Sequence, residues 1–310
     1  MSGISIIKIK PDDDGIRLNR WFLREYPSLS MGGLQKLLRT KQIKVDGKRA
    51  EASTRLSAGQ EIRIPPLDDK KAPKKEVFIS KNDEKNIKDM VIYKDDNIIV
   101  INKPAGLAVQ GGTNQTKHID GLLDALKFEK DERPKLTHRI DKDTSGVLVL
   151  ARNRKYALLL TQAFREHKIK KTYLALCVGC PKISEGQIKA QLEKVGEKMV
   201  VTEDGQKAVT NYKVLDSIGS KFCLVEAEPL TGRTHQIRVH LSHLGTPIIG
   251  DTKYGKRDDA KKADLSLKLH LHSFKIDLSV IMGKKTVVKA PLPDYFKSDI
   301  DSLGLCFKEK

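Results

Sequence analysis

Hydrophobic and polar positions change their period along the chain and divide it into three segments. Over residues 14–65, apolar residues recur at helical spacing and then alternate in short runs, so we expect two helices followed by a small sheet. Residues 66–89 are rich in charge and proline and have few periodic apolar positions, which predicts a linker. Strand-like apolar runs and helical segments alternate over residues 90–300 and indicate a second, larger domain.

A dense polar stretch lies directly before one of these apolar runs. Residues 137–150 read T-H-R-I-D-K-D-T-S-G-V-L-V-L, and the final four residues predict a strand that is buried on both faces. Gly146 lies at the joint, where backbone freedom is needed. A polar turn that leads into a rigid strand would hold a catalytic carboxylate such as Asp141 at the rim of a sheet. An ordinary turn with local side-chain hydrogen bonds fits the same spacing.

A second polar stretch covers residues 229–241, which read P-L-T-G-R-T-H-Q-I-R-V-H-L. Its apolar residues alternate as in a strand, although a helix that begins after Gly232 would also fit. Its histidines, with the one that follows, raise the question of a metal site: His235, His240 and His243. Because no H-E-x-x-H motif is present and no carboxylate lies at ligand spacing, we expect no metal.

The chain is strongly basic, with 58 lysines and arginines against 40 acidic residues and a formal charge of +18 over 310 residues. Such an excess favours a polyanionic partner, and nucleic acid is the first candidate. A lysine-rich surface that only reflects the composition of the genome would give the same count. No apolar run approaches the roughly 20 residues of a membrane span, and no signal peptide is evident, so we expect a cytoplasmic protein.

Cysteines are too few and too scattered for a disulfide framework. Cys177 and Cys180 have the spacing of a zinc knuckle, but no second pair of that spacing follows. We therefore expect reduced structural cysteines, with a zinc site or a redox pair as the alternative.

The first domain resembles the S4 RNA-binding domain in the order of three segments: R-L-N-R-W-F-L, S-M-G-G-L-Q-K-L-L-R and I-K-V-D-G-K-R. In that family, the second helix and the turn after it present basic residues to structured RNA. The matching positions here are Lys36, Arg39, Lys41, Lys44 and Lys48. Such contacts with phosphates give affinity and register but no sequence specificity. Without the resemblance, the same helix would be read as a solvated basic face.

The larger domain resembles the RluA family of pseudouridine synthases in four separated motifs. H-R-I-D-K-D-T-S-G is similar to the family signature, and T-G-R-T-H-Q-I-R-V-H is similar to its later basic motif. K-T-Y-L-A-L matches the strand with the active-site tyrosine, and V-I-Y-K-D-D-N-I-I-V-I-N-K-P-A-G-L matches the opening strands. The resemblance implies an α+β fold with a mixed, mostly antiparallel sheet flanked by helices, in addition to the small S4-like domain.

The resemblance also implies the reaction. A uridine in RNA, expected in 23S ribosomal RNA or in a large-subunit assembly intermediate, would become pseudouridine with no cofactor and no metal, in a monomeric enzyme. By the family pattern, Asp141 attacks the sugar or starts an elimination there. Arg238 would pair with Asp141 and keep it ionised. Tyr173 would lie against the uracil and relay a proton, and Arg139 would enter the RNA as the base leaves.

Two other classes of protein fit part of the sequence. A non-catalytic RNA-binding or ribosome-assembly protein would explain the S4-like segment and the charge, but it does not need Asp141, Tyr173 and Arg238 together. A hydrolase could use Asp141 or Ser145 with a histidine. However, Ser145 lacks the G-x-S-x-G elbow and no order of triad residues is evident.

Overall fold

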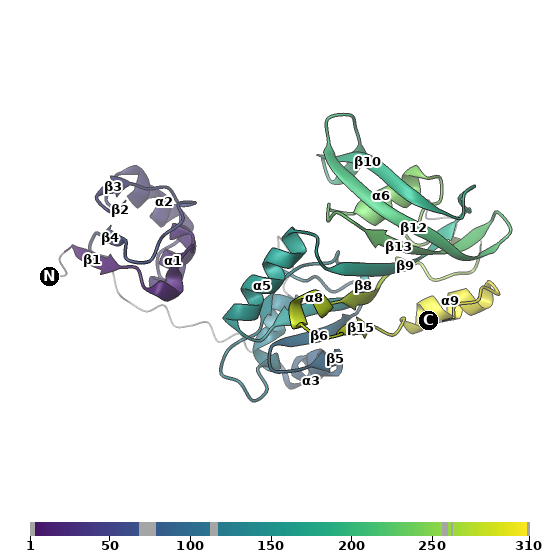
Figure 1. Cartoon of the computed structure of the whole chain (residues 1–310), viewed down its shortest axis with the longest axis horizontal. Helices are drawn as coiled ribbons and strands as arrows, with labels where there is room; N and C mark the ends of the chain where they lie inside the picture. The colour runs from purple at the N-terminus through teal and green to yellow at the C-terminus, as the bar shows by residue number, and fades with distance from the viewer. Residues whose placement is uncertain (1–3, 68–78, 112–116, 256–259, 262, 309–310) are drawn as a thin grey trace. The chain divides into compact units, whose positions relative to one another are not determined.

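The computed structural model of the protein describes residues 4–67, 79–111, 117–255, 260–261 and 263–308 (Figure 1). The chain forms two compact units, Met1–Phe78 and Ile79–Lys310. No helix in the described ranges is long and apolar enough to cross a membrane.

The first unit combines two helices with a four-stranded antiparallel sheet of order β1-β4-β2-β3. Its elements are β1 (Ser5–Lys8), a short 3-10 helix η1 (Pro11–Asp13), α1 (Leu18–Glu25), α2 (Met31–Arg39), β2 (Lys44–Val45), β3 (Lys48–Arg49) and β4 (Glu61–Ile64). The two expected helices, the hairpin and the closing strand are confirmed.

Local chemistry explains these boundaries. Ser30 caps α2, because its hydroxyl accepts a hydrogen bond from the backbone N–H of Gly33 at 3.1 Å. Asp46 and Gly47 both have positive φ, 47° and 73°, which is the conformation that an Asp-Gly hairpin turn requires. The buried apolar residues of both helices, among them Leu18, Trp21 and Leu34, pack into one core with β4, and the basic side chains remain outside.

The second unit is built on an eleven-stranded sheet with the order β11-β10-β12-β13-β9-β14-β8-β6-β5, to which β15 and β7 add at β14 and β8. Its strands are β5 (Val91–Lys94), β6 (Ile98–Lys103), β7 (Lys135–Leu136), β8 (Ser145–Ala151), β9 (Lys170–Val178), β10 (Glu185–Val195), β11 (Lys198–Val201), β12 (Gln206–Ile218), β13 (Phe222–Pro229), β14 (Leu271–Asp277) and β15 (Val287–Lys289). Among the described strands only β14 and β8 pair in parallel, which confirms the mixed, mostly antiparallel sheet.

Helices lie on both faces of this sheet. They are α3 (Lys81–Asp89), α4 (Ile119–Leu122), a short 3-10 helix η2 (Leu123–Leu126), α5 (Arg154–Arg165), α6 (Gln236–His243), α8 (Ser279–Met282) and α9 (Asp294–Ser302). The alternating segment after Gly232 is therefore a helix, not a strand.

The linker expected over residues 66–89 extends too far. Its end forms α3, which Ser80 caps by accepting from the N–H of Asp83, and the fully buried Ile87 joins the core under β6 and β8. Ile87 is the one buried residue of α3, so the sequence shows no helical period there. Residues 68–78 of the expected linker lie outside the described residues.

Strand β8 is buried on both faces, as its apolar run predicts. Val147 and Val149 pack with α5, and Leu148 and Leu150 pack with α4 and η2. Gly146 has a φ of 106°, and a Cβ atom there would lie 2.2 Å from the carbonyl oxygen of Ser273 on β14. Only glycine therefore lets the polar loop before β8 turn into the sheet against β14.

Candidate active site

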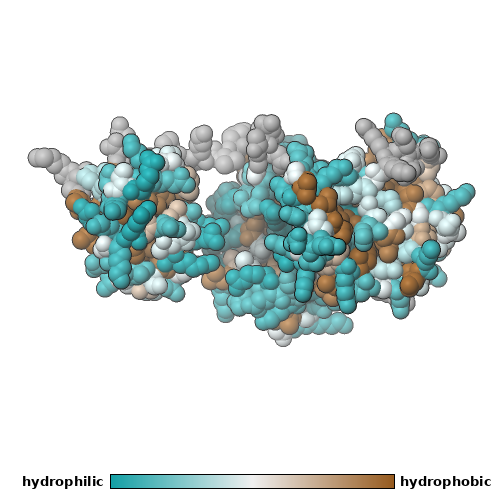
Figure 2. Space-filling model, turned by 90° about the horizontal axis from the view of Figure 1, so that it is seen from above, coloured by the Kyte–Doolittle hydropathy of each residue, from teal (hydrophilic) through white to brown (hydrophobic). Residues whose placement is uncertain are grey.

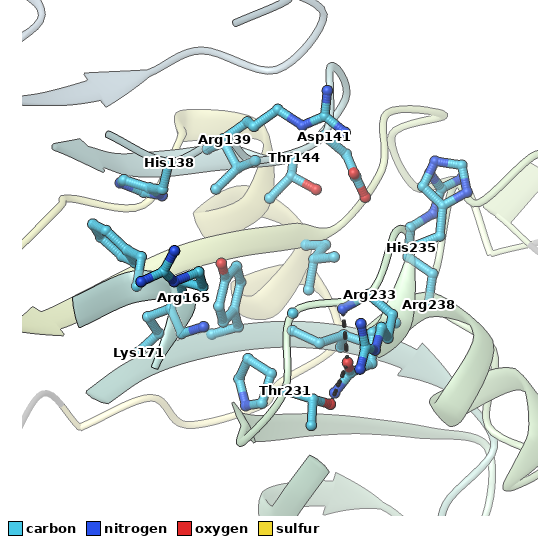
Figure 3. Close-up of a pocket in the computed structure, with 18 of the residues that line it drawn as sticks. His138, Arg139, Asp141, Thr144, Arg165, Lys171, Thr231, Arg233, His235 and Arg238 are labelled. Carbon is cyan, nitrogen blue, oxygen red and sulfur yellow. Dashed lines mark hydrogen bonds between the residues drawn. The ribbon is translucent and has the colours of Figure 1, made fainter. Parts of the chain in front are cut away.

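Asp141, Tyr173, Arg238 and Arg139, which the sequence singles out, all line one cavity of about 370 Å³ (Figure 3). Asp141 and Arg139 come from the loop before β8, Tyr173 from β9 and Arg238 from α6. The volume lies within the usual range of small-ligand sites. Residues from three separate motifs of the chain therefore meet in one pocket.

A buried lysine anchors the loop that carries Asp141. The ammonium group of Lys103 donates hydrogen bonds to the carbonyl oxygens of Pro104, Leu107 and Lys142, each at 2.8 Å. Burial lowers the pKa of Lys103 to about 7, although the charges of Asp143 and Asp141 raise it. Three carbonyl acceptors match the three donors of an ammonium ion, so the geometry favours the charged form. Lys103 thus fixes the backbone directly after Asp141.

The direct pair expected between Asp141 and Arg238 is not formed. Arg238 instead donates from Nε and Nη2 to the two carboxylate oxygens of Asp251, at 2.8 and 2.7 Å, and both side chains are almost fully buried. Asp141 has no ion pair within the part of the chain that the structure describes, and it is only half-buried. A buried guanidinium needs a bidentate partner at close range, and Asp251 provides it.

Asp251 is itself held in place by its surroundings. Its Oδ1 accepts from the backbone N–H groups of Lys253 and Tyr254, at 2.9 and 3.1 Å. Burial opposes ionisation of Asp251, but these bonds and Arg238 outweigh it and lower its pKa. For Arg238, burial lowers the pKa, while Asp251 and then the charge of Asp141 raise it, and the net effect is a rise. Asp141 therefore acts on Arg238 through its charge.

Tyr173 is almost fully buried in the pocket wall. Its pKa is raised to about 12, chiefly by burial and in part by the negative charge of Asp141, while a hydrogen bond with Ser273 opposes the rise. The phenol is therefore protonated at neutral pH and can donate a hydrogen bond.

Arg139 is exposed at the mouth of the pocket. It also borders a neighbouring cavity of about 310 Å³ that includes Asp141, Gln110 and Arg233. Its side chain, which has no ion pair in the described ranges, therefore borders both cavities, and Figure 3 shows it beside Asp141 in the first.

The structure adds residues to the site that lie within the quoted motifs but to which the sequence assigned no role. Lys171 and Arg233 bring positive charge to the same cavity, and Thr144 brings a buried hydroxyl that has no hydrogen-bond partner among the described residues. Lys171 could have been found from strand alternation, because it lies two residues before Tyr173. Asp251 carries no such signal, since it follows Arg238 by 13 residues in a loop.

His138 and the neighbouring cysteines Cys177 and Cys223 are packed within the fold. His138 stacks on Phe164 with ring centroids 4.1 Å apart, accepts from the N–H of Val149 and has a pKa lowered by burial to about 3. Cys177 and Cys223 are cross-strand neighbours on β9 and β13, and the four cysteines are free. The described residues contain no group of three or more histidine, cysteine or acidic side chains that could hold a metal ion.

The first unit presents the basic residues that match the S4 pattern. All are exposed except Lys44, which is half-buried, and none has an ion pair in the portion of the chain described: Lys36, Arg39, Lys41, Lys44 and Lys48. A space-filling view shows mainly hydrophilic side chains on the face of this unit that it presents (Figure 2). Unpaired exposed cations of this kind suit contact with phosphates.

Comparisons with known proteins connect this geometry to a family. The sequence pattern of a family described as RNA pseudouridylate synthase matches residues 97–243. A ribosomal large subunit pseudouridine synthase C from Rickettsia conorii is 42% identical over 294 residues, which covers 90% of this chain and 95% of that relative. The chain belongs to the RNA pseudouridylate synthase family. A mitochondrial RNA pseudouridine synthase 4 from Arabidopsis thaliana is 37% identical, and the match covers 96% of this chain and 78% of that protein.

A solved structure gives the same result. Human RNA Pseudouridylate Synthase Domain Containing 4 has a TM-score of 0.63 and 32% sequence identity, covering 73% of this chain and 97% of that chain. The expectation of an RNA pseudouridine synthase, an isomerase, is thereby confirmed. The matched segment of the family contains Asp141, Tyr173 and Arg238.

Proposed function

We propose that this enzyme converts uridines to pseudouridine in the ribosomal RNA of the large subunit, 23S RNA. The proposal rests on the main pocket, where Asp141 is the one acidic residue among several cations in the lining that the described residues provide. The cations of such a pocket suit a polyanionic substrate, and its carboxylate, Asp141, can take part in the reaction. The name of the Rickettsia conorii relative, a ribosomal large subunit pseudouridine synthase, supports this substrate.

Asp141 starts the reaction at the sugar, either by attack at C1′ or by elimination. The C1′–N1 bond of the uridine breaks, the uracil turns in place, and a C1′–C5 bond forms. C5 then loses its proton and N1 gains one, so the product is an isomer of the substrate. Atoms and charge balance without an added reagent. The half-buried position of Asp141, on a loop anchored by Lys103, supports a carboxylate that is aimed at the substrate and yet reachable.

Arg238 and Tyr173 prepare the site for this step. Arg238 is fixed by Asp251, and its positive charge interacts with the negative charge of Asp141, so it can stabilise negative charge that develops during the reaction. Tyr173 lies against the uracil as a neutral phenol and relays a proton at the sugar.

Arg139 assists in flipping the target base out of the RNA. A uridine inside folded RNA must leave its stack to reach Asp141, at a cost of a few kcal/mol. The exposed guanidinium of Arg139, at the junction of two cavities, can occupy the vacated space by stacking on the neighbouring bases. The first unit adds affinity through its basic residues. A monomer in the cytoplasm stays the prediction from sequence.

Asp141→Asn tests the role of the carboxylate. We expect it to abolish tritium release from large-subunit ribosomal RNA that carries 5-tritiated uridine, while RNA binding changes little, because the amide is isosteric but cannot act as nucleophile or base. Asp143→Asn is the matched control, since Asp143 is exposed and does not line the main pocket. Full activity of Asp141→Asn would contradict the mechanism.

A further inference from the structure

We propose that Lys171 and Arg165 form a subsite for a phosphodiester group of the RNA strand beside the target uridine. This inference rests on the proposed function, because it assigns a part of the substrate to the far end of the same pocket.

The backbone places Lys171 on the same face of the sheet as Tyr173. The two residues are separated by one position on β9, so their side chains project to one side at a spacing of about 7 Å. Arg165 comes from the last turn of α5 and lines the same cavity. Figure 3 shows Arg165 and Lys171 together at one end of the pocket, with His235 and Arg238 at the other.

The cations at this end have no direct ion pair within the described residues, although the charge of Glu166 interacts with that of Arg165. The side chains of Lys171 and Arg165 form no ion pair or hydrogen bond with the described residues, whereas that of the neighbouring Lys170 pairs with Glu228 at 2.9 Å. Lys171 is half-buried, and burial lowers its pKa. A partly desolvated cation without a carboxylate is stabilised when an anion binds beside it.

The pattern fits a phosphate better than a base. Uracil carbonyl groups are neutral acceptors, for which a single donor is enough, while two neighbouring cations suit the full negative charge of a phosphodiester. A ribose separates the base from the phosphate in every nucleotide, and a similar separation divides Tyr173 from Lys171 on β9. A uridine at Asp141 and Tyr173 would then direct one of its flanking phosphates to this end.

The first experiment compares Lys171→Met with Lys170→Met in the full chain, using large-subunit ribosomal RNA as substrate. Lys170 is the adjacent, exposed lysine on the other face of β9, so it controls for the loss of one charge. We expect Lys171→Met to lower kcat/KM roughly 10- to 100-fold, as for loss of a charged hydrogen bond. The slope of log affinity against log salt should fall by about 0.7 to 0.9. Equal behaviour of the two variants would overturn the subsite.

Arg165→Gln provides a second variant at an exposed helical position, with Arg154→Gln on the same helix as its control. We expect the same reduction of the salt slope for Arg165→Gln and none for Arg154→Gln. Lys171→Arg should keep the slope of the wild type, because the charge remains. A reduced slope in Lys171→Arg would assign the effect to packing and overturn the subsite.

The second experiment removes the phosphate charge instead. An RNA fragment with a mapped target uridine is made with a neutral methylphosphonate on one side of that uridine, and then on the other. At one of the two positions, we expect kcat/KM of the wild type to fall by roughly 10-fold or more and that of Lys171→Met to change little. Equal losses in both enzymes would mean that Lys171 contacts another part of the substrate. No pseudouridine from the wild type with natural RNA would refute the proposed function itself.

Discussion

At the scale of single residues, Arg238 shows how a buried cation is stabilised at the wall of the pocket. Its bidentate bond with Asp251 satisfies the guanidinium, and its carbon Cζ lies 5.2 Å from the ring centroid of Tyr254. Asp251 therefore balances the charge, and Asp141 stays free of a direct partner within the described residues. Because Asp251 pairs with Arg238, the carboxylate of Asp141 remains available to the sugar.

Asp251→Asn removes the partner of a buried charge. We expect the free energy of unfolding to fall by about 3 kcal/mol, because Arg238 loses its anion in a site from which water is excluded. Activity should fall as well, since the guanidinium loses its fixed orientation. Urea unfolding and tritium release measure the two effects. Asp131→Asn, at an exposed carboxylate, is the control, and an equally small change in both variants would contradict the role of Asp251.

The lowered pKa of Asp251 predicts that the stability of the protein depends on pH. The pKa of Asp251 in the folded protein is lower than its ordinary value of 3.8, so its ionisation stabilises the fold above that pH. This stability is lost as the pH falls through the folded pKa. We expect the wild type to exceed Asp251→Asn in unfolding free energy by a constant amount from about pH 5 to 8, and by less below pH 4. A difference that grows toward acid pH would contradict this assignment.

At the scale of elements, the loop from His138 to Gly146 determines the position of Asp141 in the site. Lys103 at the end of β6 binds its backbone, and Gly146 lets it enter β8 alongside β14. Two neighbouring strands therefore hold the loop, and Asp141 lines one pocket together with Tyr173 and Arg238.

Gly146→Ala tests this loop. The added Cβ would lie 2.2 Å from the carbonyl oxygen of Ser273, and the φ of 106° is already unfavourable for alanine. We expect a loss of about 3 kcal/mol or more in the free energy of unfolding, with a lower rate. Gly106→Ala shares a positive φ, 85°, but its Cβ meets nothing within 4 Å, so it should cost clearly less. Equal losses in chemical denaturation would exclude the contact with β14 as the cause.

Elements with a clear hydrophobic period could be predicted from the sequence, and elements without one could not. Strand β8 is a continuous apolar run and α2 has a capping serine, so both were found. Helix α3 buries only Ile87 and was taken as linker. Helix α6 is buried all round, with Arg238 and His240 among its buried residues, so its pattern fitted a strand equally well. Tertiary packing decides such cases.

At the scale of the whole molecule, the motifs could be predicted but their electrostatic partners could not. Asp141, Tyr173 and Arg238 lie in separate motifs that meet in space, as the family resemblance implies. The partner of Arg238 depends on how the loop with Asp251 folds against α6, which no local pattern encodes. The chain as a whole separates a unit with exposed cations from a unit with a pocket, and this separation suggests that affinity and chemistry can be changed independently.

Neutralising the basic face of the first unit tests that separation. A variant with glutamine at Lys36, Arg39, Lys41, Lys44 and Lys48 should bind ribosomal RNA with a slope of log affinity against log salt that is lower by up to roughly 4, because each lost phosphate contact removes about 0.7 to 0.9. Tritium release at saturating RNA should stay close to that of the wild type, since the pocket is intact. The control replaces exposed lysines of the second unit that line none of the described pockets: Lys155, Lys168, Lys182, Lys189 and Lys221. If both variants lost the same slope, net charge would explain binding, and the first unit would have no special part in it.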